Sequence, residues 1–338
     1  MSTSEPIHVV VAVDFSDEII DQLRDISPRL HIERHAGQVP DRAWAQAEIL
    51  YTLSTLPQPE QAPRLRWIQF HTAGLDRLQG HALMDASDIV VTNSSGIHAV
   101  NMTEYCLGMM LALTYKLPEM LRFQAKSEWS KDRFKVFGPL PLRGKTLGII
   151  GYGAIGRELA RAADALGMTV LAVKRDVMHP AEGLSYREPE TGDPAGEIPA
   201  RIYPPAAIAS MASLCDVLTV ITPLTGETRG LVTSEVLHGM KKTALLIDVA
   251  RGGVVDEAAL LTALKEGWIA GAAMDVFETE PLPPESPLWS APNLIISPHI
   301  AGFRADYHAR VADLFATNLR RYLSGETLLN VFTRELGY

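Results

Sequence analysis

An apolar strand pattern, a glycine-rich turn and a helical pattern follow one another mid-chain, and they restrict the fold most. Thr146–Ile150 leads into GYGAIG at Gly151–Gly156, and RELARAADALG continues with helical spacing. In such a unit Gly151 permits the tight turn, Gly153 lets a ligand approach the backbone, and Gly156 lets the helix pack close to the strand. The amides and dipole at the helix start suit a pyrophosphate. The unit predicts a dinucleotide-binding loop, the alternative being a glycine-rich turn without ligand.

Short β-branched runs alternate with helical patterns along almost the whole chain. Continuous apolar strands separated by helices predict an α/β fold with a doubly wound parallel sheet. The length of 338 residues suggests about two domains. The predicted strands are Ile7–Val13, Arg66–Phe70, Ile89–Val91, Thr146–Ile150, Thr169–Val173, Val217–Ile221, Ala244–Val249, Ala270–Met274 and Leu294–Ile296.

Three further segments help to organise the chain. Thr103–Leu117 is apolar nearly all round and stops at Pro118, which predicts a helix buried between domains or subunits. Met178–Pro204 is rich in proline, glycine and acidic residues, so we expect a long segment without regular structure. Its position after a strand places it near the adenosine end of a dinucleotide, as a surface excursion or a mobile flap. A final helix is predicted over Val311–Leu323, closed by Gly325.

Composition excludes several classes of function. The formal net charge of −9 disfavours general binding of nucleic acid or anionic membranes. Cys106 and Cys215 lie in apolar stretches and are expected to be buried residues in a reducing compartment. No Cys/His cluster has the spacing of a zinc site, so no metal is expected. The first apolar run is too short for a signal peptide or a membrane span, and the cytoplasm is the expected location.

The residues after the predicted strand Thr169–Val173 bear on cofactor choice. Sites selective for NAD usually carry an acidic residue here, which hydrogen-bonds the adenosine ribose. This chain has Lys174 and Arg175 instead. A carboxylate repels a 2′-phosphate, whereas arginine binds one in bidentate fashion. The pair predicts a preference for NADP; the alternative is a solvated basic strand end with NAD bound.

Three chemically suited residues follow three predicted strand ends. Arg251, Glu280 and His299 lie on loops that meet at the carboxyl edge of a parallel sheet, where ligands bind. Reduction of a 2-oxo acid needs a cation for the carboxylate and a proton donor near neutral pH, which Arg251 and His299 supply. Glu280 would orient the imidazole and favour its charged form. Each has a plainer interpretation, as a surface charge, a turn residue and a packed ring, and His71 is an alternative proton donor.

These residues lie in motifs that resemble the D-2-hydroxyacid dehydrogenase family, which includes glyoxylate/hydroxypyruvate reductases and phosphoglycerate dehydrogenases. The resemblance covers nearly the whole chain. The motifs are HTAGLD at 71–76, NMTE at 101–104, LRGKTLGIIGYGAIG at 142–156, TPLTGETRG at 222–230, DVARGGVVDEAAL at 248–260, DVFETEPLP at 275–283, PNLIISPHIAG at 292–302 and LLNVF at 328–332.

The resemblance implies a role for each matching residue. Arg251 would bind the substrate carboxylate, His299 would be the acid/base with Glu280 as its partner, and Asp275 would face the nicotinamide carboxamide. The backbone amides of Ala73, Gly74 and Leu75 would bind the substrate carboxylate, and Thr222 and Pro223 would line the adenine side. The cofactor-binding residues expected in all are Gly151, Gly153, Ala154, Ile155, Gly156, Lys174, Arg175, Thr222, Pro223, Val249, Ala250, Asp275 and His299.

The resemblance also implies an architecture and a partner. A Rossmann-type dinucleotide domain over residues 100–304 would be joined to a flavodoxin-like substrate domain that is discontinuous, formed by 1–99 and 305–338. The long apolar helix would help to form a homodimer. Lys174 departs from the family pattern, because many relatives carry the cofactor-selecting aspartate there.

Two alternatives to a 2-oxo acid reductase stay open. One is oxidation of formate or phosphite on the same fold, for which the chain has no dedicated features. The other is a dinucleotide-sensing scaffold like the transcriptional corepressors that resemble this family. The absence of long partner-binding tails and of a nuclear-localisation cluster favours the enzyme.

Overall fold

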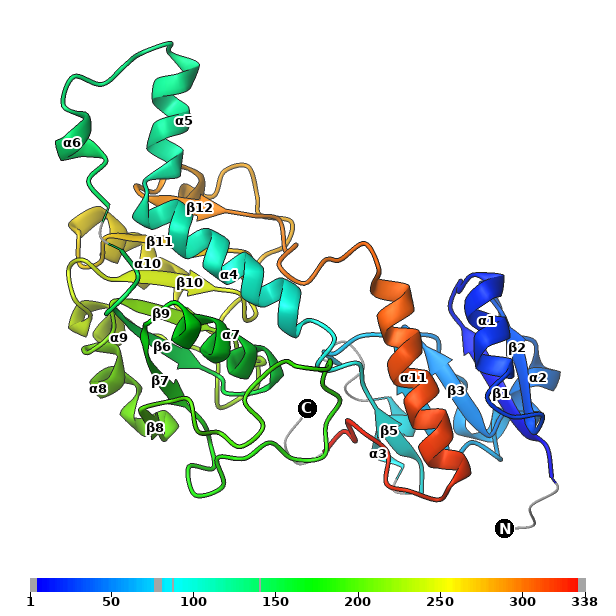
Figure 1. Cartoon of the computed structure of the whole chain (residues 1–338). Helices are drawn as coiled ribbons and strands as arrows, with labels where there is room; N and C mark the ends of the chain where they lie inside the picture. The colour runs from blue at the N-terminus through cyan, green and yellow to red at the C-terminus, as the bar shows by residue number, and fades with distance from the viewer. Residues whose placement is uncertain (1–4, 76–80, 87, 140, 334–338) are drawn as a thin grey trace. The chain divides into compact units, whose positions relative to one another are not determined.

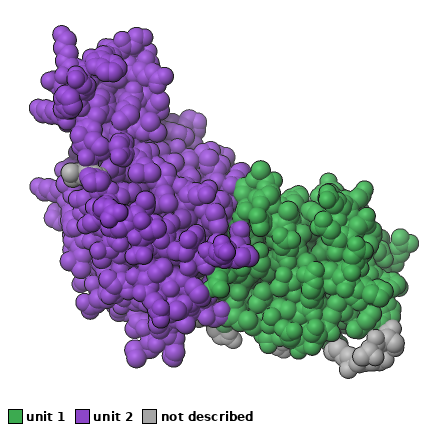
Figure 2. All heavy atoms as spheres, viewed as in Figure 1, with its two compact units in different colours: residues 1–97, 184–187, 304–338 green, residues 98–183, 188–303 purple. Residues whose placement is uncertain are grey.

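The chain folds into two compact units (Figure 1). The computed structural model describes residues 5–75, 81–86, 88–139 and 141–333. Figure 2 shows unit 1, formed by residues 1–97, 184–187 and 304–338, and unit 2, formed by 98–183 and 188–303. The sequence placed the domain boundaries after residues 99 and 304, and it did not indicate the short piece 184–187. Asp76, which ends the HTAGLD motif, and residues 334–338 lie outside the described residues.

Unit 1 is built on a parallel sheet of five strands in the order β2-β1-β3-β4-β5, which is the flavodoxin-like order. The strands are β1 Ile7–Ala12, β2 Leu30–Arg34, β3 Ile49–Thr52, β4 Trp67–Phe70 and β5 Val90–Thr92. Its helices are α1 Asp17–Arg24, α2 Asp41–Gln46, α3 Ala82–Asp85 and α11 Tyr307–Leu323, with a 3₁₀ turn at Pro59–Gln61. β2 and β3 are additional to the predicted strands.

The C-terminal helix α11 belongs to the core of unit 1. Its apolar stripe includes Val311, Phe315 and Leu319, all of which are buried. The ring of Phe315 lies 4.7 Å from that of Tyr51 on β3 and 5.4 Å from that of Trp67 on β4, measured between centroids. Helical spacing along the sequence thus becomes one continuous face that covers the five-stranded sheet.

Unit 2 contains seven parallel strands in the order β12-β11-β10-β9-β6-β7-β8. The order reverses between β6 and β9, as in a Rossmann-type sheet. The strands are β6 Thr146–Ile150, β7 Thr169–Val173, β8 Arg201–Tyr203, β9 Val217–Val220, β10 Leu245–Asp248, β11 Gly271–Met274 and β12 Leu294–Ile296. The predicted fold class, two α/β units with parallel sheets, is confirmed.

The helices of unit 2 correct one expectation. α4 Ala99–Thr114 packs on α7 Ala154–Ala165, and a separate helix α5 Leu117–Ala125 follows it (Figure 1). Pro118 lies in the first turn of α5, where a missing amide proton costs nothing, so it starts a helix instead of marking the end of one. The remaining elements are α6 Arg133–Val136, α8 Ile208–Ala212, α9 Ser234–Gly239 and α10 Glu257–Glu266, with 3₁₀ turns at Pro205–Ala207 and Pro287–Ser290.

The acidic segment Met178–Pro204 is more ordered than its composition predicts. Its end forms β8, which pairs with β7 at the edge of the seven-stranded sheet. Asp193 is buried, and its carboxylate accepts hydrogen bonds from backbone amides of the same segment. Residues 184–187 belong to unit 1, where the amide of Tyr186 donates to Oδ1 of Asn330 at 2.8 Å. The expectation of a segment without regular structure holds for residues 178–200, which contain no helix or strand, and fails at 201–203, which form β8. Buried polar groups hold the irregular part in place.

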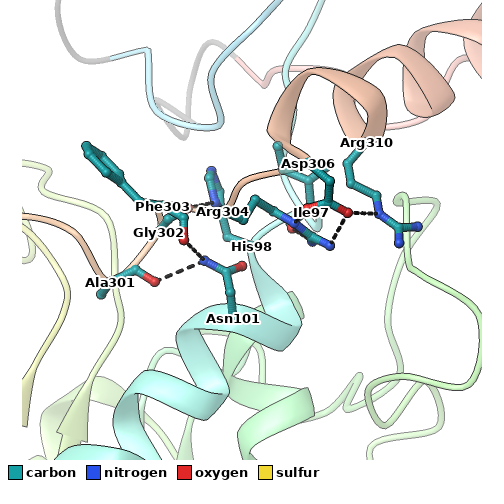
Figure 3. A network of polar contacts seen from close by, with 9 residues as sticks. All are labelled: Ile97, His98, Asn101, Ala301, Gly302, Phe303, Arg304, Asp306 and Arg310. Carbon is teal, nitrogen blue, oxygen red and sulfur yellow. Dashed lines mark hydrogen bonds and ion pairs between the residues drawn. The ribbon is translucent and has the colours of Figure 1, made fainter.

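The chain passes from one unit to the other at residues 97–98 and 303–304. Side-chain hydrogen bonds within each unit hold both of these stretches (Figure 3). In unit 2, Nδ2 of Asn101, from the NMTE motif, donates to the carbonyl of Ala301 at 3.0 Å. In unit 1, the guanidinium of Arg304 donates to the carbonyl of Ile97 at 2.8 Å. Arg304 also pairs with Asp306 at 2.6 Å, and this contact helps to lower the pKa of Asp306 to about 2.

Three general features concern membranes, metals and thiols. No helix in the described ranges is long and apolar enough to cross a bilayer. Within the same ranges, no group of three His, Cys, Asp or Glu side chains is placed to hold a metal ion. Cys106 and Cys215 are both buried and free.

Candidate active site

The glycine-rich turn connects β6 to α7 at the point where the strand order reverses. Gly151 has a φ of +108°, a left-handed conformation that favours glycine. A Cβ on Gly156 would lie 2.3 Å from the carbonyl oxygen of Gly151, so close packing of helix on turn requires glycine there. A Cβ on Gly153 would meet no heavy atom of the described residues within 4 Å. The open space over Gly153 and the bare helix start after it fit the pyrophosphate of a dinucleotide.

The loop after β9 lies beside the glycine-rich turn. A Cβ on Gly151 would lie 3.0 Å from the backbone nitrogen of Thr222. Thr228 closes this loop by donating from Oγ1 to the carbonyl of Pro223 at 2.6 Å. Thr222 and Pro223 are thus at the switch point of the sheet, where an adenosine moiety binds in folds of this order.

The two cations after β7 are directed differently. Nζ of Lys174 donates to backbone carbonyls of the following turn, those of Asp176 and His179. The guanidinium of Arg175 instead pairs with Glu227, on the loop after β9, at 3.0 Å. Arg175, unlike Lys174, therefore extends toward the loop that follows β9.

A hydrogen bond joins His299 and Glu280 at the other side of the switch point. Nδ1 of His299 lies 2.7 Å from Oε2 of Glu280. The second oxygen of Glu280 accepts from the amide of Phe277 at 3.0 Å, which holds the carboxylate on its own loop. The histidine side chain keeps 43% of its surface exposed. An imidazole oriented through Nδ1 and still accessible is the arrangement that a general acid needs.

Asp275 holds the loop that carries His299. Its carboxylate is buried and accepts from the amides of Ile300 at 2.9 Å and Ala301 at 2.8 Å. It also accepts from Oγ of Ser297 at 2.6 Å, and Ser297 is hydrogen-bonded in turn to Tyr105 on α4. Sequence reasoning missed Ser297 and Tyr105, because a serine two residues before the histidine and a tyrosine on an apolar helix have no distinctive spacing.

The loop after β10 places Arg251 next to the loop that carries Glu280. A Cβ on Gly252 would lie 1.9 Å from the carbonyl oxygen of Phe277, so only glycine permits this approach. The guanidinium of Arg251 donates to the carbonyl of Ala250 at 2.8 Å and is half-buried. The three loops predicted to carry the chemistry are therefore neighbours at one edge of the sheet.

The turn before Arg251 is buried. Val249 and Ala250 have almost no exposed surface. Asp248 accepts from the amide of Ala250 at 3.1 Å. Burial, with the nearby charges of Glu257 and Asp275, raises the pKa of Asp248 to about 7.

The predicted substrate loop of unit 1 follows β4. Thr72 donates from Oγ1 to the carbonyl of Gly74 at 3.0 Å, and Ser94 donates from its amide to the carbonyl of Thr72 at 3.0 Å. Ala73 and Gly74 are half-buried and Leu75 is buried. These bonds give the loop a defined backbone at the carboxyl end of its strand.

His71, the alternative proton donor, is enclosed in an aromatic cluster of unit 1. Only 7% of it is exposed, and its Nδ1 lies 2.8 Å from the hydroxyl of Tyr51. Burial, assisted by the neighbouring His308, lowers the pKa of His71 to about 4. The ring is therefore uncharged near neutral pH.

Comparison with known proteins agrees with this arrangement. Residues 107–301 match the family described as D-isomer specific 2-hydroxyacid dehydrogenase, NAD binding domain. The glyoxylate reductase of Aeropyrum pernix is 34% identical over 303 residues, which are 86% of this chain and 84% of that protein. The chain belongs to the D-2-hydroxyacid dehydrogenase family.

Other relatives of this dehydrogenase support the same membership. The glycerate dehydrogenase of Methylorubrum extorquens is 35% identical over 272 residues, 79% of each chain. A D-isomer specific 2-hydroxyacid dehydrogenase from Xanthobacter autotrophicus Py2, solved in complex with NADPH and MES, superimposes with a TM-score of 0.79. It is 28% identical, and the match covers 98% of this chain and 100% of that one. The protein is thus an oxidoreductase, and the matched NAD-binding region begins and ends within unit 2.

Proposed function

We propose that this dehydrogenase reduces a small 2-oxo acid of the glyoxylate or hydroxypyruvate type to the D-2-hydroxy acid. The observation that carries the proposal is the contact of 2.7 Å between His299 and Glu280, on loops adjoining the one that carries Arg251. Relatives named glyoxylate reductase and glycerate dehydrogenase support the substrate class.

His299 is the proposed general acid. Its Nδ1 is engaged by Glu280, so Nε2 is the nitrogen that gives its proton to the carbonyl oxygen of the substrate. The carboxylate fixes the orientation of the ring. Asp275 determines where the ring sits, because it binds the two amides that follow His299.

Arg251 is the proposed anchor of the substrate carboxylate. A guanidinium binds a carboxylate through two parallel hydrogen bonds, which sets the orientation of the carbonyl as well as its position. The amides of Ala73, Gly74 and Leu75 are the proposed second contact to the same carboxylate. A net charge of −9 makes such local donors necessary for an anionic substrate.

The proposed cofactor is NADPH, with NADH as a second, weaker one. When bound, the reduced nicotinamide supplies the hydride to the carbonyl carbon. The amides after Gly153 would hold the pyrophosphate, and Arg175 would bind the 2′-phosphate at the end of β7. The Xanthobacter relative solved with NADPH supports this preference.

His71 is the weaker candidate for the acid. A ring with a pKa of about 4 carries a proton in only a small fraction of molecules at neutral pH. Its Nδ1 is also engaged by Tyr51. We therefore assign the proton transfer to His299.

We further propose that unit 2 binds the dinucleotide, that unit 1 supplies the substrate loop, and that two copies form a homodimer. Supporting the dimer, the arm formed by α5 and α6 stands clear of its sheet in Figure 1 and exposes large apolar side chains. Trp129 is 84% and Phe134 80% exposed. Large apolar side chains left exposed on a projecting arm are characteristic of an interface. Light scattering after chromatography should give the mass of two chains, and Trp129→Ser should lower it.

The proposed reaction is tested with a panel of 2-oxo acids and NADPH, followed by the loss of nicotinamide absorbance. Turnover of glyoxylate or hydroxypyruvate is expected. NADPH binding without turnover of any 2-oxo acid would favour the sensing scaffold. Reduction of NADP by formate or phosphite would instead favour the other alternative.

A further inference from the structure

The acidic segment Met178–Pro204 is bound to the glycine-rich turn through the buried side chain of Asp193. Tyr152, the second residue of GYGAIG, is 4% exposed and donates from its hydroxyl to Oδ2 of Asp193 at 2.5 Å. Asp193 is 6% exposed. Three backbone amides of the segment bind the same carboxylate, which fixes its position independently of the tyrosine.

A second set of contacts holds the segment on helix α7. Arg157, one turn after Gly153, is 2% exposed and donates to the carbonyls of Asp193 at 2.5 Å and Pro180 at 2.6 Å. Its guanidinium also lies 4.7 Å from the centre of the Tyr152 ring. Burial of a charged side chain is costly unless every donor is used, so these bonds define one arrangement of segment and helix.

Glu158, the next residue of α7, also binds the backbone of the acidic segment. Glu158 is 3% exposed and accepts from the amide of Gly192 at 2.6 Å. Its other oxygen pairs with Arg161 at 2.5 Å. The acidic segment is therefore docked on the first turns of α7 by two of that helix's own side chains, Arg157 and Glu158, together with Tyr152.

The contact with Asp193 holds Tyr152, which lies in the turn whose amides are proposed to bind the phosphates. Tyr152 lies between Gly151, whose φ is +108°, and Gly153, which precedes the first residue of α7. Glycine on both sides leaves this backbone little intrinsic preference. A side chain held at its far end removes that freedom before a ligand arrives, and preorganisation of this kind strengthens binding.

We infer that Tyr152 and Asp193 are positioning residues that preset the glycine-rich turn for the pyrophosphate of the dinucleotide. The inference rests on the proposed cofactor binding and extends it to a segment outside the dinucleotide motif. Because the pyrophosphate is common to both cofactors, the effect is the same for NADPH and NADH. It differs in this from the effect of Arg175, which depends on the 2′-phosphate.

Calorimetric titration of the full chain with NADPH and with NADH, in the absence of substrate, tests the inference. Tyr152→Phe keeps the ring and removes only the hydroxyl, and Asp193→Asn keeps the shape and removes the charge. Each should raise the Kd of both cofactors by about 3- to 10-fold, the scale of one hydrogen bond. Glu197→Gln is the matched control, because Glu197 is exposed on the same segment and contacts Asp193 through its backbone amide.

Thermal melting and kinetics separate positioning from stability. The inference requires that Tyr152→Phe raises the KM of the cofactor while kcat at saturation and Tm stay close to those of the unchanged chain. A lower Tm with unaltered Kd values would show that the contact only stabilises the fold, and would overturn the inference. A loss confined to NADPH would also overturn it. If the unchanged chain bound neither cofactor, the proposed function itself would fail.

Discussion

The guanidinium of Arg175 lies 3.0 Å from the carboxylate of Glu227, and the pair joins the loops that follow β7 and β9. Both side chains are largely exposed, so the pair contributes little to stability. If Arg175 binds the 2′-phosphate as proposed, the neighbouring carboxylate opposes the approach of that phosphate.

Substitutions of this pair should change cofactor choice in opposite directions. Arg175→Ala should weaken NADPH by about 1–3 kcal/mol, the scale of a lost charge-assisted contact, and change NADH much less. Glu227→Gln should strengthen NADPH relative to NADH. Kd values for the two cofactors measure both effects. Equal losses for both cofactors in Arg175→Ala would remove the 2′-phosphate argument.

His299→Ala should lower turnover by about two to four orders of magnitude, because reduction loses its proton donor. Cofactor binding should persist, since the proposed site of the phosphates is the glycine-rich turn. The companion variant is His71→Ala, which we expect to keep most of the turnover at neutral pH. Full activity without His299 and collapse without His71 would move the acid to unit 1.

Glu280→Gln should lower turnover by about 10-fold or more, because a carboxylate accepts hydrogen bonds at both oxygens and an amide accepts at only one. One oxygen of Glu280 lies 2.7 Å from Nδ1 of His299, and the other accepts from the amide of Phe277 at 3.0 Å. The value of kcat at saturating substrate and cofactor checks this, with Glu285→Gln as a control that removes an exposed carboxylate from the same loop. Unaltered turnover would show that Glu280 does not orient the acid.

Arg251→Lys should raise the KM of the 2-oxo acid by about 10- to 100-fold, because an ammonium group cannot reproduce the bidentate fork. The KM of the cofactor should change little. Steady-state kinetics with either reactant varied separates the two. A fall in kcat alone would mean that Arg251 acts on the carbonyl and not on the carboxylate.

His71 should make stability depend on pH. Burial lowers the pKa of His71 from 6.5 to about 4 in the folded chain, so folding favours the uncharged ring. The contribution of this ring to the free energy of unfolding is fully present above pH 6.5. As the pH falls, the unfolded chain takes up a proton first, and the stabilisation is lost by about pH 4, by up to about 3 kcal/mol. The free energies of unfolding in urea of the unchanged chain and of His71→Gln should therefore differ less at pH 4 than at pH 7.5. A difference independent of pH would contradict the shift.

Some strands were missed because their signals are local and short. β3 has four fully buried residues, and β2 ends in the charged residues Glu33 and Arg34. β8 has only three residues within a segment rich in proline and glycine. Each exists because a neighbouring strand supplies its hydrogen bonds, and no pattern within the segment reveals that partner.

The sequence alone determined the elements whose causes are local. GYGAIG between a strand and a helix defines the turn, since glycine supplies the backbone freedom and the close approach at fixed spacing. Strand ends place Arg251, Glu280 and His299, because all strands of a parallel sheet deliver their next residues to one edge.

Only the tertiary structure decided the contacts between distant residues. Tyr152 and Asp193 are 41 positions apart, and the composition around Asp193 indicated a surface excursion or a mobile flap. An acidic residue becomes buried when the fold brings several donors to its carboxylate together, and that convergence depends on the path of the whole chain. The pairing of Arg175 with Glu227 depended on the same convergence, because their loops meet only where the order of the strands reverses.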